Sequence, residues 1–393
     1  MAENIIHLVL AKLPDAPEGV RGISLFLVPK MNVNDDGSTG ESNNVTCGSI
    51  EHKMGINASP TCVMNYEASE GYLVGDPHKG LRAMFAMMNE ARLYVGIQGL
   101  GLAEVSYQNA AAYAKERLQG RALKGAKYPD KVADPLVVHP DVRRMLLTMR
   151  AFTEGARALA HKTALIIDIH KRHPDEKARN NADEFINFIT PILKSYFTDA
   201  GFEATNLAMQ VYGGHGYIKE YGVEQYVRDA RIAQIYEGAN GIQALDLVGR
   251  KLPYKTGRYL RFFFHTATQF VESHRDNDQM AEFTKPLHQA LGSAQNASLW
   301  VAGNGLANPD DAAAGSCEYL RLLALTVFAY IWADMAEVCL RKLEENPSDP
   351  EFYENKLATA RFYMNKVLPY HYGHLASIVN GSKSVMAMAD DAF

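Results

Sequence analysis

The chain has 393 residues, of which 47% are hydrophobic and 22% are charged, and its formal net charge is −5 at pH 7. A chain of this length can bury large apolar cores and is expected to form two or three domains. The small negative charge gives no sign of a nucleic-acid-binding surface, which would be strongly basic.

The cysteines give no sign of a metal centre or a disulfide framework. There are four of them, Cys47, Cys62, Cys317 and Cys339. They lack CxxC spacing, so free thiols in a reducing compartment and no metal site are expected. Residues 1–10 lack the basic start and cleavage site of a signal peptide, and the uncharged apolar run 322–333 is too short to cross a bilayer. We therefore expect a cytoplasmic protein without a membrane span.

Residues 1–78 show the pattern of a small β domain. Short β-rich runs at 5–10, 22–29, 61–66 and 71–75 alternate with turn clusters such as NDDGSTGESNN. The first run starts almost at Met1 with nothing before it to pair with, and native domains usually protect an open sheet edge. We expect either a very small domain or a chain whose beginning is missing.

Residues 79–253 are expected to form a helical bundle. Apolar residues recur every three or four positions from residue 81 to about 117, and further helices are predicted at 139–172, 184–212 and 241–252. Gly96, Gly99 and Gly101 are small enough to let a neighbouring helix approach closely. The segments 120–135 and 171–184 are expected to separate the first three helices.

Residues 254–393 predict an additional helical domain. Four helical stretches, roughly 257–275, 279–303, 310–345 and 350–378, are interrupted by Asn308-Pro309 and by Pro347 to Pro350. This pattern is typical of a second bundle.

One motif of more than thirty residues indicates the chemistry. Residues 210–243 read QVYGGHGYIKEYGVEQYVRDARIAQIYEGANGIQ, and MNEAR at 88–92, YAKER at 113–117 and EHKMGINAS at 51–59 precede it in order. The chain resembles the carboxy-terminal part of the acyl-CoA dehydrogenases over residues 1 to about 250. The resemblance implies a mainly α protein with a partial β domain: an acyl-CoA dehydrogenase-like partial β-barrel, a four-helix-type bundle and an extra carboxy-terminal helical domain.

Glu237 is the candidate catalytic base. In this family the Glu of the YEG motif removes a proton from the carbon next to a thioester carbonyl, while a flavin accepts a hydride from the next carbon. A carboxylate base works best where it is poorly solvated, and Ile235 and Tyr236 are expected to shield it. Gly238 lacks a Cβ and would let substrate and flavin approach. The alternative is that Glu237 only precedes a helix capped by Asn240.

The resemblance also implies binding sites for FAD. Gly213 and Gly214 would face the adenosine end of an FAD held by a neighbouring subunit, with Gln210 beside them; a plain helix stop is the alternative. Arg117 would pair with the FAD pyrophosphate or, alternatively, complement its helix dipole. His215 is expected to fill a tight turn rather than to catalyse.

Substrate contacts are implied at Asn89, Arg92 and Tyr236. Asn89 stands where the family often has Asp. Two other departures are Ala239, where the family usually has Thr, and Pro140, near a position often held by a flavin-contacting Gln. The linker at 120–135 and the helices after Pro253 resemble the longer bacterial subgroup that includes 3-methylmercaptopropionyl-CoA dehydrogenase.

The sequence therefore predicts an FAD-dependent acyl-CoA dehydrogenase that makes a trans-2-enoyl-CoA. The resemblance implies a homodimer or homotetramer that passes electrons to an electron-transfer flavoprotein. The chain is expected to be an amino-terminally truncated product that binds FAD weakly and is inactive alone. The alternative is a catalytically inactive flavin-binding or structural protein of the same fold.

Overall fold

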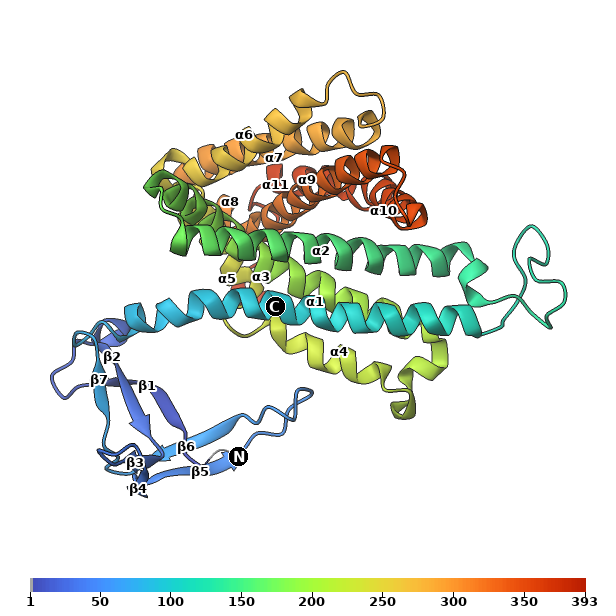
Figure 1. Cartoon of the computed structure of the whole chain (residues 1–393). Helices are drawn as coiled ribbons and strands as arrows, with labels where there is room; N and C mark the ends of the chain where they lie inside the picture. Colours follow the sequence, from blue (N-terminus) through green and yellow to red (C-terminus); the bar gives the residue numbers. More distant parts are fainter. Residues whose placement is uncertain (1–2) are drawn as a thin grey trace. The chain divides into compact units, whose positions relative to one another are not determined.

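The computed structural model describes residues 3–393, apart from the side chain of Asn89. The chain forms two compact units, one that ends at Ala91 and one that runs from Arg92 to Phe393. Most of the secondary structure is helical and the sheets are small, which confirms the expected fold class. Figure 1 labels the elements in chain order.

The first unit contains three small antiparallel sheets. Their strands are β1 Ile6–Lys12, β2 Ile23–Pro29, β3 Met31–Val33, β4 Thr39–Ser42, β5 Val45–Ile50, β6 Cys62–Tyr66 and β7 Tyr72–Val74. The largest sheet has the order β1-β2-β7, and β3-β4 and β5-β6 are separate pairs. All four predicted β runs are confirmed. The strands β3 to β5 were missed. The polar turn at 34–38, where Gly37 has a φ of +84°, separates the short strands β3 and β4 and hides their pattern.

The second unit is helical. Helix α1, Gly80–Glu116, begins in the first unit and belongs to the second from Arg92 onward. The others are α2 Pro140–Arg172, α3 Glu176–Tyr212, α4 Val223–Arg231, α5 Asn240–Asp246, α6 Arg258–Ser273, α7 Ala281–Ala307, α8 Pro309–Ala314, α9 Ser316–Glu344, α10 Pro350–Phe362 and α11 Tyr370–Val379. A π-helical turn, Leu247–Lys251, extends α5, and another, Tyr363–Val367, follows α10.

The start of α3 corrects one prediction. The charged segment 171–184 was expected to separate two helices, yet α3 already begins at Glu176. Asp175 caps it, because its carboxylate accepts a hydrogen bond from the Lys177 backbone N–H at 3.0 Å. A cap of this kind starts a helix even where the following residues are polar.

Helices α1 and α3 approach closely, as the glycines predicted. A Cβ at Gly99 would lie 2.5 Å from the backbone oxygen of Phe197, and one at Gly96 would collide with Leu193. Gly101 was expected to do the same and does not, because nothing lies within 4 Å of its Cβ position. This close approach positions α3 beside the residues of α1 that contact the candidate site.

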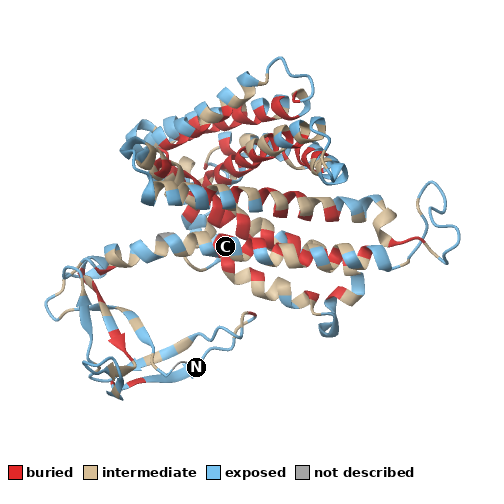
Figure 2. Ribbon diagram, in the orientation of Figure 1, coloured by how far each residue is buried: buried red, intermediate tan, exposed pale blue. Residues whose placement is uncertain are grey.

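The carboxy-terminal helices share a core with α2 and α3. The rings of Phe152 and Phe328 stack at 6.1 Å, and the indole N–H of Trp332 donates to the backbone oxygen of Ala151 at 3.2 Å. Buried residues run continuously through these helices in Figure 2. The boundary at residue 253 therefore stays a prediction.

Helix α9 is a long apolar helix of the core. It is long and apolar enough to cross a membrane by length and composition, but 72% of its most apolar stretch is buried inside the protein. Helix α9 packs mainly against α7, α10 and α11 and also against α2 and α3, which accounts for this composition, as in the central helix of a helical bundle.

Residues 117–139 form an ordered loop between α1 and α2. The buried carboxylate of Asp134 accepts backbone N–H bonds from Ala122, Lys127 and Tyr128 at 2.8–3.1 Å. Burial would raise the pKa of Asp134, but these bonds outweigh it and lower the pKa to about 2. Asp134 thus ties together three backbone positions of the loop, and Arg121 adds bonds to the backbone oxygens of Tyr128 and Lys131. Pro140 begins α2 directly after the loop.

Candidate active site

The candidate base lies on a strained loop. Between α4 and α5 the backbone turns so that Glu237 has a φ of +56° and Gly238 a φ of +89°. The left-handed conformation costs a residue with a Cβ about 1–2 kcal/mol. Such strain persists only where the surroundings impose it, and it is concentrated at functional sites.

Three elements hold this loop in place. The Tyr236 hydroxyl donates to Gln98 Oε1 on α1, and burial raises the pKa of this tyrosine. The backbone oxygen of Gly238 accepts from Lys194 Nζ on α3 at 2.8 Å and from Gln243 Nε2 on α5 at 3.3 Å. The residues on both sides of Glu237 are therefore fixed to separate helices.

Lys194 is a functional candidate that the sequence analysis missed. Its side chain is fully buried, and its ammonium donates to Gly238 O and Asn240 Oδ1, both at 2.8 Å. Burial lowers its pKa to about 8, although the carboxylates of Asp199 and Glu237 act in the opposite direction. One signal was present in the sequence: Lys194 is the single charged residue in the apolar run 185–198.

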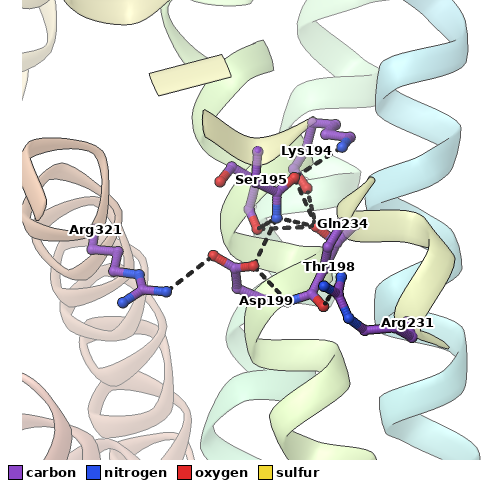
Figure 3. Close-up of polar contacts among 8 residues, drawn as sticks. Lys194, Ser195, Thr198, Asp199, Arg231, Gln234 and Arg321 are labelled. Carbon is purple, nitrogen blue, oxygen red and sulfur yellow. Dashed lines mark hydrogen bonds and ion pairs between the residues drawn. The ribbon is translucent and has the colours of Figure 1, made fainter. Parts of the chain in front are cut away.

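Behind Lys194 lies a network of polar side chains, which Figure 3 shows. Asn240 Nδ2 donates to Asp199 Oδ1 at 2.7 Å and to Thr198 Oγ1 at 2.9 Å. Gln234 Nε2 also donates to Asp199 Oδ1 at 2.7 Å, and Arg321 from α9 lies 3.5 Å from Asp199 Oδ2. Helix α9 thereby reaches the network that supports the loop.

Asn240 does not cap α5, contrary to the alternative considered from sequence. Ala239 occupies the N-cap position, and Asn240 is the first residue of the helix. Its side chain instead turns toward α3, where it bonds with Lys194 and Asp199. The side chain of Asn240 therefore bonds to polar residues of α3 and does not cap its own helix.

The surroundings of Glu237 differ in part from the prediction. Among the described residues, its Oε2 is buried and has no hydrogen-bond partner. Ile235, expected to shield it, is itself 56% exposed. Arg92 lies close to the loop, since a Cβ at Gly238 would be 3.8 Å from Arg92 Nη2. The side chain of Asn89 lies outside the described residues.

The predicted adenosine-binding residues lie together at the far end of α1. Gln210, Gly213 and Gly214 are exposed at the end of α3, and Arg117 is exposed just after α1 ends. Gly213 has a φ of +59°, so the helix stop explains this residue. Gly214 has no positive φ, and a Cβ there would meet nothing within 4 Å. Its surface is open to approach from outside.

His215 belongs to an aromatic cluster beside these glycines. Its Nδ1 lies 2.9 Å from the Tyr113 hydroxyl, and its ring stacks on Tyr221 at 4.6 Å. Tyr113 also stacks on Tyr212 at 4.0 Å. These contacts fill the turn with packed rings, and none of them involves a carboxylate that could orient a catalytic histidine.

The predicted site residues therefore form two separate groups. Arg92, Tyr236, Glu237 and Gly238 surround one part of α1, while Arg117 and the glycine turn lie at its end. At about 1.5 Å per residue, the helix from Arg92 to Glu116 is roughly 36 Å long. A cofactor that contacted both groups on a single chain would have to span this length. Across the part of the chain that the structure describes, no cluster of three or more His, Cys, Asp or Glu side chains could hold a metal ion.

Comparison with known proteins agrees with the motif. One family model, described as "Acyl-CoA dehydrogenase, C-terminal domain", matches residues 78–252, and another, "Acetyl-CoA dehydrogenase C-terminal like", matches residues 263–389. The chain belongs to the acyl-CoA dehydrogenase family. It is 42% identical over 372 residues to 3-methylmercaptopropionyl-CoA dehydrogenase of Ruegeria pomeroyi, an alignment that covers 94% of this chain and 62% of that protein. The expected relation to this longer subgroup is confirmed.

Solved acyl-CoA dehydrogenase structures share the fold. The structure of Caenorhabditis elegans ACDH-11 in complex with C11-CoA matches with a TM-score of 0.73 at 19% identity, over 92% of this chain and 56% of that one. An acyl-CoA dehydrogenase complexed with FAD from Bacillus anthracis matches with a TM-score of 0.72 at 18% identity, over 95% and 60%. The chain spans just under two thirds of the length of the curated relatives it matches first.

Ala239 is a departure from the acyl-CoA dehydrogenase pattern with a measurable consequence. It occupies the N-cap of α5 with no side-chain hydrogen bond, where the family usually has Thr. We expect Ala239→Thr to stabilise the protein by about 1 kcal/mol, because a threonine hydroxyl can accept from a free N–H in the first turn. Urea unfolding measures this. Ala239→Val is the control of matched shape, and equal stability of the two variants would exclude capping as the cause.

Proposed function

We propose that the chain catalyses the FAD-dependent α,β-dehydrogenation of an acyl-CoA thioester to a trans-2-enoyl-CoA. The observation that carries this proposal is the carboxylate of Glu237 on a strained loop held from three helices, with a buried oxygen that has no hydrogen-bond partner among the described residues. A buried acceptor without a partner is costly unless a ligand uses it.

Glu237 acts as the general base. Its carboxylate takes the proton from the carbon next to the thioester carbonyl, so that the Cα–H bond breaks and an O–H bond forms on Glu237. The electron pair of that C–H bond becomes the second bond between Cα and Cβ as a hydride leaves Cβ. FAD supplies the acceptor for that hydride when it is bound.

The surface beside the loop suits an acyl-CoA and a flavin. Large apolar side chains on the same elements are exposed, namely Tyr94, Ile97, Ile235, Ile242 and Leu245. An acyl chain or a flavin ring would cover such surface, since exposed apolar groups gathered around a polar centre indicate a binding site. In this proposal Arg92 and Tyr236 contact the substrate.

The two groups of site residues support a homo-oligomer, either a homodimer or a homotetramer. Arg117, Gln210, Gly213 and Gly214 would contact an FAD whose flavin end lies beside Glu237 of another copy. The length of α1 between the groups supports this arrangement. We expect the purified protein with FAD to sediment as an oligomer, and Gly214→Trp to lower its FAD content. A monomer with one FAD per chain would contradict the arrangement.

An electron-transfer flavoprotein is the proposed acceptor of the electrons. The reduced flavin must be reoxidised after each turnover, and the family resemblance names this partner. A coupled assay with a purified electron-transfer flavoprotein tests the pairing separately from the chemistry on the acyl-CoA.

The decisive experiment is anaerobic titration of the FAD-loaded protein with a panel of acyl-CoAs. Bleaching of the flavin spectrum by at least one of them, with formation of the enoyl-CoA, is the expected result. Persistence of the oxidised spectrum with every acyl-CoA would favour the alternative, a catalytically inactive flavin-binding or structural protein. The panel also identifies the chain length that the site accepts.

A further inference from the structure

We propose that Lys194 is the positioning residue for Glu237: its ammonium joins the carbonyl oxygen of Gly238 to the side chain of Asn240 and thereby fixes the backbone that aims the carboxylate. This inference rests on the proposed role of Glu237 as base. It goes further by assigning the geometry of the loop to one buried side chain on α3.

The hydrogen bonds of Lys194 span the turn that follows the base. Lys194 Nζ lies 2.8 Å from Gly238 O and 2.8 Å from Asn240 Oδ1. These acceptors lie one and three residues after Glu237, so a single cation ties together the left-handed turn and the first residue of α5. A loop with two successive left-handed residues needs such external support.

Packing alone does not explain a lysine at this place. Lys194 is fully buried among the apolar residues Ile192, Leu193 and Phe197 of α3. An uncompensated charge in such surroundings is strongly unfavourable, and an apolar side chain of similar volume would often be tolerated equally well or better. The ammonium of Lys194 is compensated here because the loop supplies hydrogen-bond acceptors for it.

The charged groups around Lys194 connect it to the base and to the network behind it. The carboxylates of Glu237 and Asp199 favour its ammonium form, and the guanidinium of Arg92 opposes it. Asp199 also bonds to Asn240, because its Oδ1 accepts a hydrogen bond from Asn240 Nδ2 at 2.7 Å. The orientation of Asn240 is thus set from one side by Asp199 and from the other by Lys194, which leaves the loop little freedom to shift.

The test compares Lys194→Met with Lys162→Met. Methionine keeps the length and apolar stem of lysine but removes its charge and donors. Lys162 is a matched control, because its Nζ also has two partners, Asp334 Oδ2 at 3.1 Å and the Tyr330 hydroxyl at 3.5 Å, away from the loop. Both variants are examined as the FAD-loaded protein.

Two quantities are measured in each variant. The first is the exchange of the substrate α-hydrogen with solvent deuterium in the absence of an electron acceptor, which reports reversible proton abstraction by Glu237 without net turnover. The second is backbone hydrogen exchange of the peptide that spans residues 232–245, which reports the order of the loop whether or not the protein turns over. Affinity for the acyl-CoA and FAD content are recorded alongside.

We expect Lys194→Met to lower α-hydrogen exchange about 100-fold, because a displacement of about 1 Å in a reacting group has an effect of this size. Loop protection should fall, while acyl-CoA affinity and FAD content stay within about twofold. Lys162→Met should change neither loop protection nor α-hydrogen exchange.

The proposal is overturned if folded Lys194→Met keeps wild-type α-hydrogen exchange and loop protection, or if Lys162→Met loses both to the same extent. Should Lys194→Met not fold, Asn240→Ala decides, because it removes one of the two acceptors and is expected to lower α-hydrogen exchange about tenfold. A wild-type protein without α-hydrogen exchange contradicts the proposed function instead, and loop protection still tests the role of Lys194.

Discussion

Replacing Glu237 with Gln is expected to abolish proton abstraction while FAD content and folding are preserved. The amide has the shape of the carboxylate but cannot accept the α-proton. General-base catalysis contributes about 100- to 10,000-fold, so the variant should retain no more than a few per cent of the wild-type rate. Enoyl-CoA formation and flavin bleaching under single-turnover conditions measure the loss.

Stability gives an internal check on this variant. The Glu237→Gln protein would keep the left-handed backbone at this position, so its strain is unchanged, and the melting temperature should stay close to that of the wild type. The matched control is Glu224→Gln, which removes a carboxylate that pairs with Arg228 at 2.6 Å on α4, outside the loop. A Glu237→Gln protein with more than a few per cent of the wild-type rate would show that another group abstracts the proton.

The parts of the fold that the sequence predicted are those with a local signal. Helix α2 was expected at 139–172 and runs from Pro140 to Arg172, since both its apolar periodicity and its starting proline are visible in the sequence. The motif around Glu237 was equally readable because its residues are consecutive. Short strands inside a polar turn, such as β3 and β4, carry no such periodicity and were missed.

The support of the loop could not be predicted, because it depends on contacts between distant segments. Lys194 lies 44 residues before Gly238, whose carbonyl oxygen it reaches. Asn240 was interpreted as a helix cap from its neighbours alone, and only the packing of α3 against α5 shows why its side chain turns away. The exposure of Ile235 likewise depends on which surfaces surround the loop. Consecutive motif residues pointed to the candidate base, and tertiary packing decides which residues surround it.

The second large effect is expected for Gly238→Ala. Gly238 has a φ of +89°, and a Cβ there would lie 2.5 Å from Gln243 Nε2. Gln243 is 1% exposed and has little room to move. The left-handed backbone alone costs alanine about 1–2 kcal/mol, and relief of the collision requires either the Gln243 amide, which donates to the Gly238 carbonyl oxygen at 3.3 Å, or the backbone to shift.

This shift is expected to affect catalysis more than stability. The carbonyl oxygen of Gly238 accepts a hydrogen bond from Lys194. A movement of the Gly238 peptide would therefore change the direction in which the carboxylate of the adjoining Glu237 points. We expect α-proton abstraction to fall at least about 100-fold, with a loss of stability somewhat above the 1–2 kcal/mol of the backbone strain.

The control is Gly222→Ala, because Gly222 has a φ of +72° and nothing within 4 Å of its Cβ position. It carries the same kind of strain without the collision, so it should lower the free energy of unfolding by about 1–2 kcal/mol and leave the rate unchanged. If the two alanine variants lose equal stability and both retain activity, the close contact at Gly238 does not control the position of Glu237.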